Sequence, residues 1–301
     1  MTSGLTLDEA LQRLPLLGQP LEVTELPGGL TNHNYRVRTA THDVVVRISP
    51  PGTELLAIDR AHEWHNSAVA ASVGVGAPVV DYLPGQGVLV VEFLPGRTYA
   101  AADVAANVSR VAAAARRLHG GPAFASRFDM FAVQRGYLRI VRERGYAVPQ
   151  GYDALEPAAA RVEAALRTHP EPLVPCHNDL LAANILDDGG DLRFIDYEYS
   201  GMNEASFELG NLADESHLDR DRLVALVEAY HGLVTARLLA RAELWGLAGR
   251  WAWTLWGAIQ HGVSEVDHDF WDFAMERHEL ARALLTSARL DDLLDAAGAA
   301  A

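Results

Sequence analysis

The sequence predicts an α+β fold with two lobes: an N-terminal antiparallel sheet that carries one helix, and a larger, mainly helical C-terminal lobe. Short β-type runs separated by turn residues fill the first part of the chain, whereas from about Ala101 the apolar residues follow helical spacing. Neighbouring strands joined by short turns pair antiparallel. We therefore expect lobes at 1–95 and 96–301, with a ligand cleft between them.

The N-terminal lobe begins with a short amphipathic helix in "LTLDEALQRLP", which Thr6 caps and Glu9 completes as a capping box. Three β-type runs follow, then a helix over 55–73 and two further strands. "PGRTYA" (95–100) is expected to be the linker between the lobes. The expected strands are 21–26, 33–39, 43–49, "VVDYL" and "GVLVVEFL".

The C-terminal lobe opens with a helix in "VAANVSRVAAAARRLHGG" that ends at a glycine pair. A hairpin is expected where "ILDD" and "LRFIDYE" flank Gly189 and Gly190. Long helices are expected over 204–291, and the last residues, "AAGAAA", read as a frayed tail.

Composition restricts the partners of the protein. The 301 residues carry a formal net charge of −15, with 40 acidic against 25 basic residues, so we expect no nucleic-acid partner and favour a small cationic substrate. No signal-peptide pattern and no uninterrupted apolar run of membrane-spanning length occurs. We expect a cytoplasmic protein without membrane insertion, either a monomer or a homodimer. The single cysteine, Cys176, is expected to be a small buried residue.

The stretch "CHNDLLAANILDDGGDLRFIDYEYSG" concentrates polar side chains at tight spacing. Asp179 and Asn184 follow a His at the spacing of the protein-kinase catalytic loop, and Asp196 ends the next hairpin. In that loop the Asp accepts the proton of a substrate hydroxyl and the Asn binds Mg²⁺. Each residue taken singly is also a common turn residue. As an ordered set they predict a catalytic base at Asp179 and Mg²⁺ ligands at Asn184 and Asp196.

The N-terminal lobe offers the parts of an ATP site. A glycine pair between two strands lets backbone N–H groups approach phosphates, Arg47 supplies a cation, and Glu63 is its expected ion-pair partner. A hairpin turn and a surface cation would explain these features singly, but their order favours a nucleotide site. The candidate cofactor-binding residues are Gly28, Gly29, Leu30, Thr31, Asn32, Arg47, Glu63 and the hinge residues Glu92, Phe93 and Leu94.

At "CHNDLLAANIL…FIDYEYSGMNEASFELGN" the sequence resembles the choline/ethanolamine kinases, within the aminoglycoside-phosphotransferase and protein-kinase-like group. The resemblance extends over about residues 24–280. It implies a protein-kinase-like fold and transfer of the γ-phosphoryl group of ATP to choline or a related amino alcohol. It assigns Asp179, Asn184 and Asp196 the catalytic roles given above, with Mg²⁺ on the last two, and an arginine at position 47 matches choline-kinase-like proteins. It also implies polar roles around the metal and substrate for Glu198, Asn211 and Glu215.

Aromatic residues near the C-terminus bear on the substrate. Trp253 and Trp256 lie three apart on one helical face, and Phe270 and Phe273 follow. A quaternary ammonium has no N–H donors, so aromatic faces and carboxylates hold it, and the resemblance implies that these residues form a choline pocket. A helix–helix core would give the same stripe. The candidate substrate-binding residues are Asp179, Glu198, Glu215, Trp253, Trp256, Phe270 and Phe273.

Several alternatives remain open at this point. Phe270 and Phe273 stand where some family members have Tyr, which leaves the exact amine open. Separately, the acceptor could be ethanolamine, an aminoglycoside, thiamine or a sugar. A non-catalytic nucleotide-binding protein would keep the fold without the activity. A metal-dependent hydrolase would use the Asp cluster, but it leaves the glycine pair and Arg47 unexplained. The pair His62 and His65 lacks a third ligand for a metal site.

Overall fold

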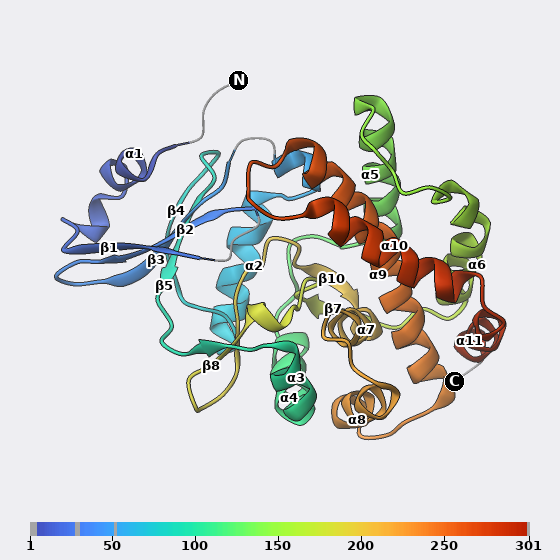
Figure 1. The fold of residues 1–301 in the computed structure, drawn as a ribbon. Helices are drawn as coiled ribbons and strands as arrows, with labels where there is room; N and C mark the ends of the chain where they lie inside the picture. Colours follow the sequence, from blue (N-terminus) through green and yellow to red (C-terminus); the bar gives the residue numbers. More distant parts are fainter. Residues whose placement is uncertain (1–4, 28–30, 51–52, 300–301) are drawn as a thin grey trace.

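The computed structural model describes residues 5–27, 31–50 and 53–299, and it shows two lobes side by side (Figure 1). An antiparallel sheet forms the N-terminal lobe, and helices fill most of the other lobe, so the predicted α+β, two-lobed fold is confirmed. Gly28, Gly29 and Leu30, which we predicted to bind phosphate, lie outside the described residues.

Five strands form the N-terminal sheet among the described residues, in the order β1-β2-β3-β5-β4, and every neighbouring pair is antiparallel. Short connections join β1 to β2, β2 to β3 and β4 to β5, whereas β3 pairs with β5 and a long segment leads from β3 to β4. Every second residue along β3 and β5 faces the same side of the sheet, which places Val44, Val46, Val88 and Val90 in one apolar layer. The strands are β1 (Glu22–Leu26), β2 (His33–Arg38), β3 (Asp43–Ile48), β4 (Val79–Leu83) and β5 (Val88–Glu92).

The first helix covers that apolar layer. Helix α1 (Leu7–Gln12) and the short 3-10 helix η1 (Pro15–Leu17) place Ala10, Leu14 and Leu17 against the sheet. The predicted capping box is present: the Thr6 hydroxyl accepts from the backbone N–H of Glu9, and the Glu9 carboxylate accepts from that of Thr6. The sheet therefore has a helix of its own on its outer face (Figure 1).

The second helix lies between the sheet and the helical lobe (Figure 1). The sequence predicted one helix over 55–73. The structure instead has a 3-10 turn, η2 (Thr53–Leu56), and then α2 (Arg60–Ser72), which begins at the N-cap Asp59. Asp59 interrupts the helix because its side chain accepts from two backbone N–H groups of the first turn. Buried Ala70 of α2 belongs to the core of the C-terminal lobe, so this helix joins the two lobes.

Three predictions about connecting segments need correction. The expected linker 95–100 contains a strand, β6 (Arg97–Thr98), which pairs with β8 (Ile185–Asp187), and β8 pairs in turn with β9 (Arg193–Phe194). The helix expected to end at the glycine pair is broken at Asn107 into two. The tail expected to fray after 295 is helical as far as Gly298. Pairing and packing with distant segments, which sequence periodicity does not encode, account for these differences.

The C-terminal lobe is organised around one long helix, α9 (Ala236–Val263), which packs against α5, α6, α7, α10 and α11. Most of its residues are buried, as expected for a helix surrounded by others. The remaining elements are α3 (Ala101–Ala106), α4 (Val108–His119), α5 (Met130–Arg144), η3 (Asp153–Leu155), α6 (Glu156–Thr168), β7 (Leu173–Cys176), η4 (Ala182–Asn184), β10 (Gly201–Glu204), α7 (Ala205–Glu215), α8 (Arg220–His231), α10 (Phe270–Leu285) and α11 (Arg289–Gly298).

Two glycines allow α7 and α9 to cross closely. A Cβ atom on Gly210 would lie 2.0 Å from the carbonyl oxygen of Ala242, and one on Gly246 would lie 2.9 Å from the carbonyl oxygen of Gly210. Backbone meets backbone at this crossing, so no side chain can move aside. The close approach fixes the position of α7, which carries several of the candidate site residues.

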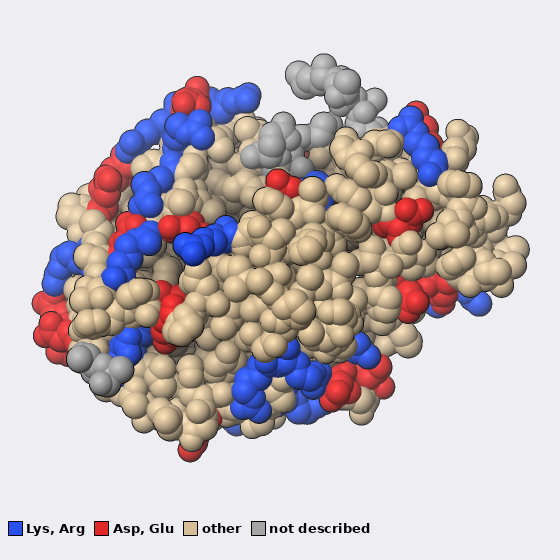
Figure 2. Space-filling model, turned by 180° about the vertical axis from the view of Figure 1, so that it is seen from behind, with Lys and Arg blue, Asp and Glu red and all other residues tan. Residues whose placement is uncertain are grey.

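No single helix in the described part of the chain has both the length and the apolar content of a membrane span, although the bent pair α8 and α9 meets that test by length and composition. On the face shown in Figure 2, acidic and basic side chains lie interspersed around a broad uncharged surface.

We predict that Gly210→Ala lowers the free energy of unfolding by about 3 kcal/mol, because the added methyl group overlaps backbone atoms of α9. Gly136→Ala in α5 is the matched control, since a Cβ there meets nothing within 4 Å. That control should raise stability by about 0.5 kcal/mol by removing a flexible residue from a helix. Urea denaturation of both variants measures the difference, and equal stabilities would contradict the proposed close crossing.

Candidate functional site

The loop after β7 carries Asp179, and a buried glutamate on α7 holds it in place. The Glu208 carboxylate accepts the backbone N–H groups of His177 and Asn178, at 2.9 and 2.7 Å. Asn178 has a left-handed backbone, with φ of 64°, a conformation that Asn tolerates better than most residues. Its side-chain amide donates to the carbonyl of Tyr199 and its oxygen accepts from Asn203. Asp179 therefore starts from a backbone that is fixed on both sides.

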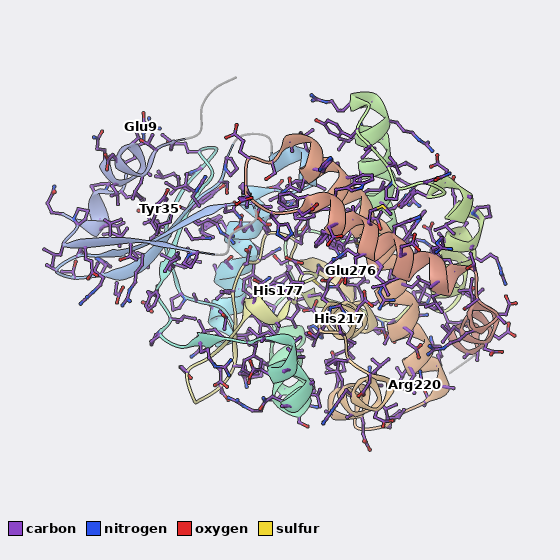
Figure 3. The ribbon with its side chains drawn as sticks, in the orientation of Figure 1. Glu9, Tyr35, His177, His217, Arg220 and Glu276 are labelled. Atoms are coloured by element: carbon purple, nitrogen blue, oxygen red, sulfur yellow. The ribbon has the colours of Figure 1, made fainter. Side chains whose placement is uncertain are left out.

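Hydrogen bonds join this loop to the loop that carries Asp196. The Asn184 side-chain amide donates to the backbone carbonyl of Asp179 at 2.8 Å, and the N–H of Ile195 donates to the carbonyl of Asn184 at 3.0 Å. His177 Nε2 donates to the carbonyl of Ile195 at 2.8 Å. His177 lies where the two lobes meet (Figure 3). The structure thus brings the two loops with Asp179, Asn184 and Asp196 together.

Arg47 of β3 is the central cation of the site. It is 8% exposed and forms ion pairs with Glu63 of α2 and with Asp196. The predicted ion pair between Arg47 and Glu63 is therefore present. The additional pairing with Asp196 was not predicted from the sequence, because nothing in residue spacing shows how close a strand of one lobe comes to a loop of the other.

The carboxylates at the site differ in their electrostatics. Burial raises the pKa of Asp179 well above its usual range, and the charges of Asp196 and Glu198 raise it further. Burial works in the same direction at Asp196, but the Arg47 guanidinium outweighs it and lowers the pKa of that carboxyl. The arrangement keeps Asp196 ionised, as a metal ligand must be, and makes Asp179 the stronger base.

A cleft of about 530 Å³ lies between the lobes beside these residues. Its walls combine polar groups at one end with apolar side chains from both lobes, which suits a flat aromatic base and a charged tail. Of the predicted site residues, Arg47, Glu92, Phe93, Leu94, Asn184 and Asp196 line it. The sequence analysis did not single out the apolar lining residues Val45, Ala77, Leu89, Val91, Leu186 and Phe194.

Hydrogen bonds within the hinge segment, residues 92–94, limit which of its backbone groups are free to bind the edge of a nucleotide base. The N–H of Glu92 donates to the carbonyl of Pro78, and the N–H of Phe93 donates to the carbonyl of Asp43. Both donors are thus used within the sheet. The predicted hydrogen bonds to an adenine edge would therefore come from Leu94 and from carbonyl groups of this segment.

Thr31 and Asn32 connect the lobes through Glu198. The Thr31 hydroxyl and the Asn32 amide donate to the two carboxylate oxygens of Glu198, at 2.9 and 2.8 Å. Arg60 of α2 contacts the same carboxylate at 3.1 Å. We predicted Glu198 as a substrate ligand, but in this structure its contacts are with the N-terminal lobe.

The predicted aromatic residues do meet in space. The ring of Trp256 lies 5.7 Å from that of Phe270 and 5.2 Å from that of Phe273. Trp253 packs edge-on against Tyr199 and donates its indole N–H to Asn211. Trp253, Trp256 and Phe270 are buried and belong to the main apolar core, so both the pocket and the core interpretation fit this packing.

Tyr199 and Glu208 are site residues that the sequence analysis did not name. The Tyr199 hydroxyl accepts from the indole N–H of Trp256 at 3.1 Å and lies 3.4 Å from the hydroxyl of Tyr137. Tyr199 thus joins the aromatic group to the loop of Asp196. Tyr199 lies in "IDYEYSG" and Glu208 in "FELGN", both within the motif that carries the family resemblance. The motif therefore pointed to this region, but only the tertiary structure shows what each of the two residues contacts.

A divalent cation would have limited protein ligands at this site. Among the described residues no set of three or more His, Cys, Asp or Glu side chains is arranged to hold a metal ion. The Asn184 amide group is oriented by its bond to Asp179, and Asp196 is ionised, so both provide the hard oxygen atoms that Mg²⁺ prefers. The residues fit Mg²⁺ when nucleotide phosphates complete its coordination.

Comparison with known proteins settles the family. A model of the phosphotransferase enzyme family (APH) matches residues 22–245. A solved structure of a choline/ethanolamine kinase family protein from Mesorhizobium loti is 32% identical, with a TM-score of 0.83, and the match covers 97% of this chain and 98% of that one. The chain belongs to the choline/ethanolamine kinase family. This finding confirms the predicted family and an alcohol-acceptor phosphotransferase as the enzyme class.

Two further proteins are similar to this chain in sequence. Protein LicA of Haemophilus influenzae is 28% identical over 274 residues, which is 86% of this chain and 78% of that protein. Ethanolamine kinase 2 of Rattus norvegicus is 34% identical over 146 residues, which is 42% of this chain and 38% of that protein.

We predict that Glu208→Ala reduces kcat by about 10²-fold, because two buried N–H groups lose their acceptor and Asp179 shifts. Steady-state kinetics and nucleotide binding are the measurements, and nucleotide binding should persist. Glu171→Ala is the matched control: Glu171 accepts two hydrogen bonds from Ser206 at the start of the same helix without touching the loop. An equal loss of kcat in both variants would show that Glu208 has only a general structural effect.

Proposed function

We propose that this protein transfers the γ-phosphoryl group of ATP to the hydroxyl group of choline or a related amino alcohol. The observation that carries the proposal is that Asn184 and Asp196 line a cleft between the lobes and that the Asn184 amide is hydrogen-bonded to the backbone of Asp179, in a chain of the choline/ethanolamine kinase family. The negative charge of the protein favours a cationic acceptor, and so do Glu215 and the Phe273 ring, which both contact the cation of Arg277.

Each residue has a role that follows from its position. Asp179 accepts the proton of the acceptor hydroxyl, and burial strengthens it as a base. Arg47, aimed by Glu63, binds nucleotide phosphates. Asn184 and Asp196 would hold Mg²⁺, which when bound neutralises charge on the phosphate oxygens. The apolar walls of the cleft hold the base, and the fixed loops keep the reacting groups aligned.

The acceptor could be a primary amine such as ethanolamine instead of a quaternary ammonium such as choline. Ethanolamine kinase 2 is among the relatives, and a primary amine could use its N–H donors on the carboxylates near the site. The buried rings of Trp256 and Phe270 and the partly buried ring of Phe273 favour a quaternary ammonium instead, since they offer faces and no acceptors. An ADP-release assay with choline, ethanolamine, an aminoglycoside, thiamine and a sugar separates the candidates. Turnover with none of these acceptors would overturn the proposal.

We predict that Asp179→Asn lowers kcat by about 10²- to 10⁴-fold on the best acceptor, since the amide cannot accept the hydroxyl proton. ATP binding, measured by calorimetry, should be retained because Asp179 contacts the acceptor. Near-normal turnover of this variant would contradict its assignment as the base.

We predict that removal of divalent cations with EDTA abolishes turnover and that added Mg²⁺ restores it. Asp196→Ala should raise the Mg²⁺ concentration needed for half-maximal turnover, because one of two protein ligands is lost. Activity that persists in EDTA would exclude Asn184 and Asp196 as ligands of an essential metal.

A further inference from the structure

Glu215 and Phe273 already hold a positive charge that belongs to the protein itself. The guanidinium carbon of Arg277 lies 3.4 Å from the centroid of the Phe273 ring, and its Nη2 contacts the Glu215 carboxylate at 2.5 Å. The side chains of Arg277 and Glu215 are only 14% and 10% exposed. A buried carboxylate and an aromatic face therefore enclose one cation.

This pair of groups is what an ammonium acceptor needs. A trimethylammonium group is bound by an aromatic face and a nearby carboxylate, without hydrogen bonds. Glu215 and Phe273 are the residues that we assigned to the acceptor, and Phe273 also contacts Trp256. Arg277 and a cationic acceptor would thus compete for the same ring and the same carboxylate.

The Arg277 guanidinium does not use all of its hydrogen-bond donors, so a substrate cation has fewer contacts to break when it displaces this group. Its Nε atom has no hydrogen-bond partner among the described residues, although it is buried. Its Nη1 lies 3.6 Å from the carboxylate of Glu276, which is 55% exposed and also lies on α10 (Figure 3). A second carboxylate, nearer to solvent, is therefore within reach of the guanidinium when it leaves Glu215.

We propose that Arg277 is a specificity-determining residue that occupies the ammonium site until a cationic acceptor replaces it. The inference rests on the proposed function. Removing the guanidinium without replacing its charge leaves Glu215 buried and unpaired, which is costly. A cationic acceptor restores that charge and a neutral alcohol does not, so the exchange selects for cations.

The first test is the sign of a change in KM. Arg277→Met keeps an unbranched apolar stem and removes the guanidinium group with its charge, so the competing cation is lost. We expect the KM for choline to fall about three- to tenfold, with kcat changed less than about twofold. An unchanged or raised KM in the folded variant would overturn the inference and leave Arg277 as a support for the pocket walls.

The matched control is Arg250→Met. Arg250 of α9 pairs with Asp214, the neighbour of Glu215 on α7, so its loss removes the same charge beside the same helix turn. Arg250 has no ring contact among the described cation–ring pairs. The KM for choline should therefore stay within about twofold of the wild-type value. An equal fall in both variants would show that general electrostatics, rather than competition, sets the KM.

Two further measurements identify the competition directly. In the Glu215→Gln background, Arg277→Met should change the KM for choline less than it does in the wild type, because the two residues act on each other. In Arg277→Ala, added methylguanidinium should raise the KM for choline competitively and bring it back toward the wild-type value, with no such effect on the wild-type enzyme. Additive effects of the two substitutions, or absence of competition by methylguanidinium, would overturn the inference.

These outcomes separate the inference from the proposed function. A wild-type enzyme that phosphorylates no amino alcohol overturns both. A wild-type enzyme that phosphorylates choline, together with an Arg277→Met variant whose KM does not fall, overturns the inference alone. Circular dichroism of each variant confirms that it is folded before its kinetics are interpreted.

Discussion

The ion pairs of Arg47 are the interaction on which the rest of the site depends. This guanidinium starts on a strand of the N-terminal sheet, meets Glu63 on α2, and reaches Asp196 on a loop of the C-terminal lobe. Three segments that are far apart in sequence are thus tied to one buried charge. Because removing one partner of a buried ion pair leaves an uncompensated charge, the three segments must keep their relative positions. The cleft between the lobes takes its shape from that requirement.

Crowding of carboxylates gives the site its chemistry. Asp179, Asp196 and Glu198 lie close enough that their charges affect one another, and burial raises the pKa of Asp179 and of Glu198. Arginines offset this repulsion selectively. Asp196 has Arg47 beside it and is ionised, whereas Asp179 forms no ion pair with an arginine among the described residues and becomes the stronger base. Unequal access to arginine therefore assigns different roles to similar side chains.

The same principle extends to the proposed acceptor side. Glu215 is a buried carboxylate that needs a cation, and Arg277 supplies it while stacking on Phe273. The aromatic residues around it belong to the main core or pack against it, so the proposed substrate pocket also contributes to the stability of the lobe. A binding site built from core residues is held rigidly, which favours a well-defined acceptor geometry.

The sequence by itself determined most of the elements and the family. Strand and helix types, the capping box at Thr6 and the pairing of Arg47 with Glu63 could all be predicted, because they depend on local periodicity and on short motifs. The tertiary structure decided what depends on distant contacts. These are the strand at Arg97, the place of α2 between the lobes and the hydrogen bonds from the loop of Asp179 to Glu208. They also include the interlobe contacts of Glu198 and the pairing of Arg277 with Glu215. Spacing along the chain fixes which side chains share a helix face, but only packing decides which opposite charges are buried together.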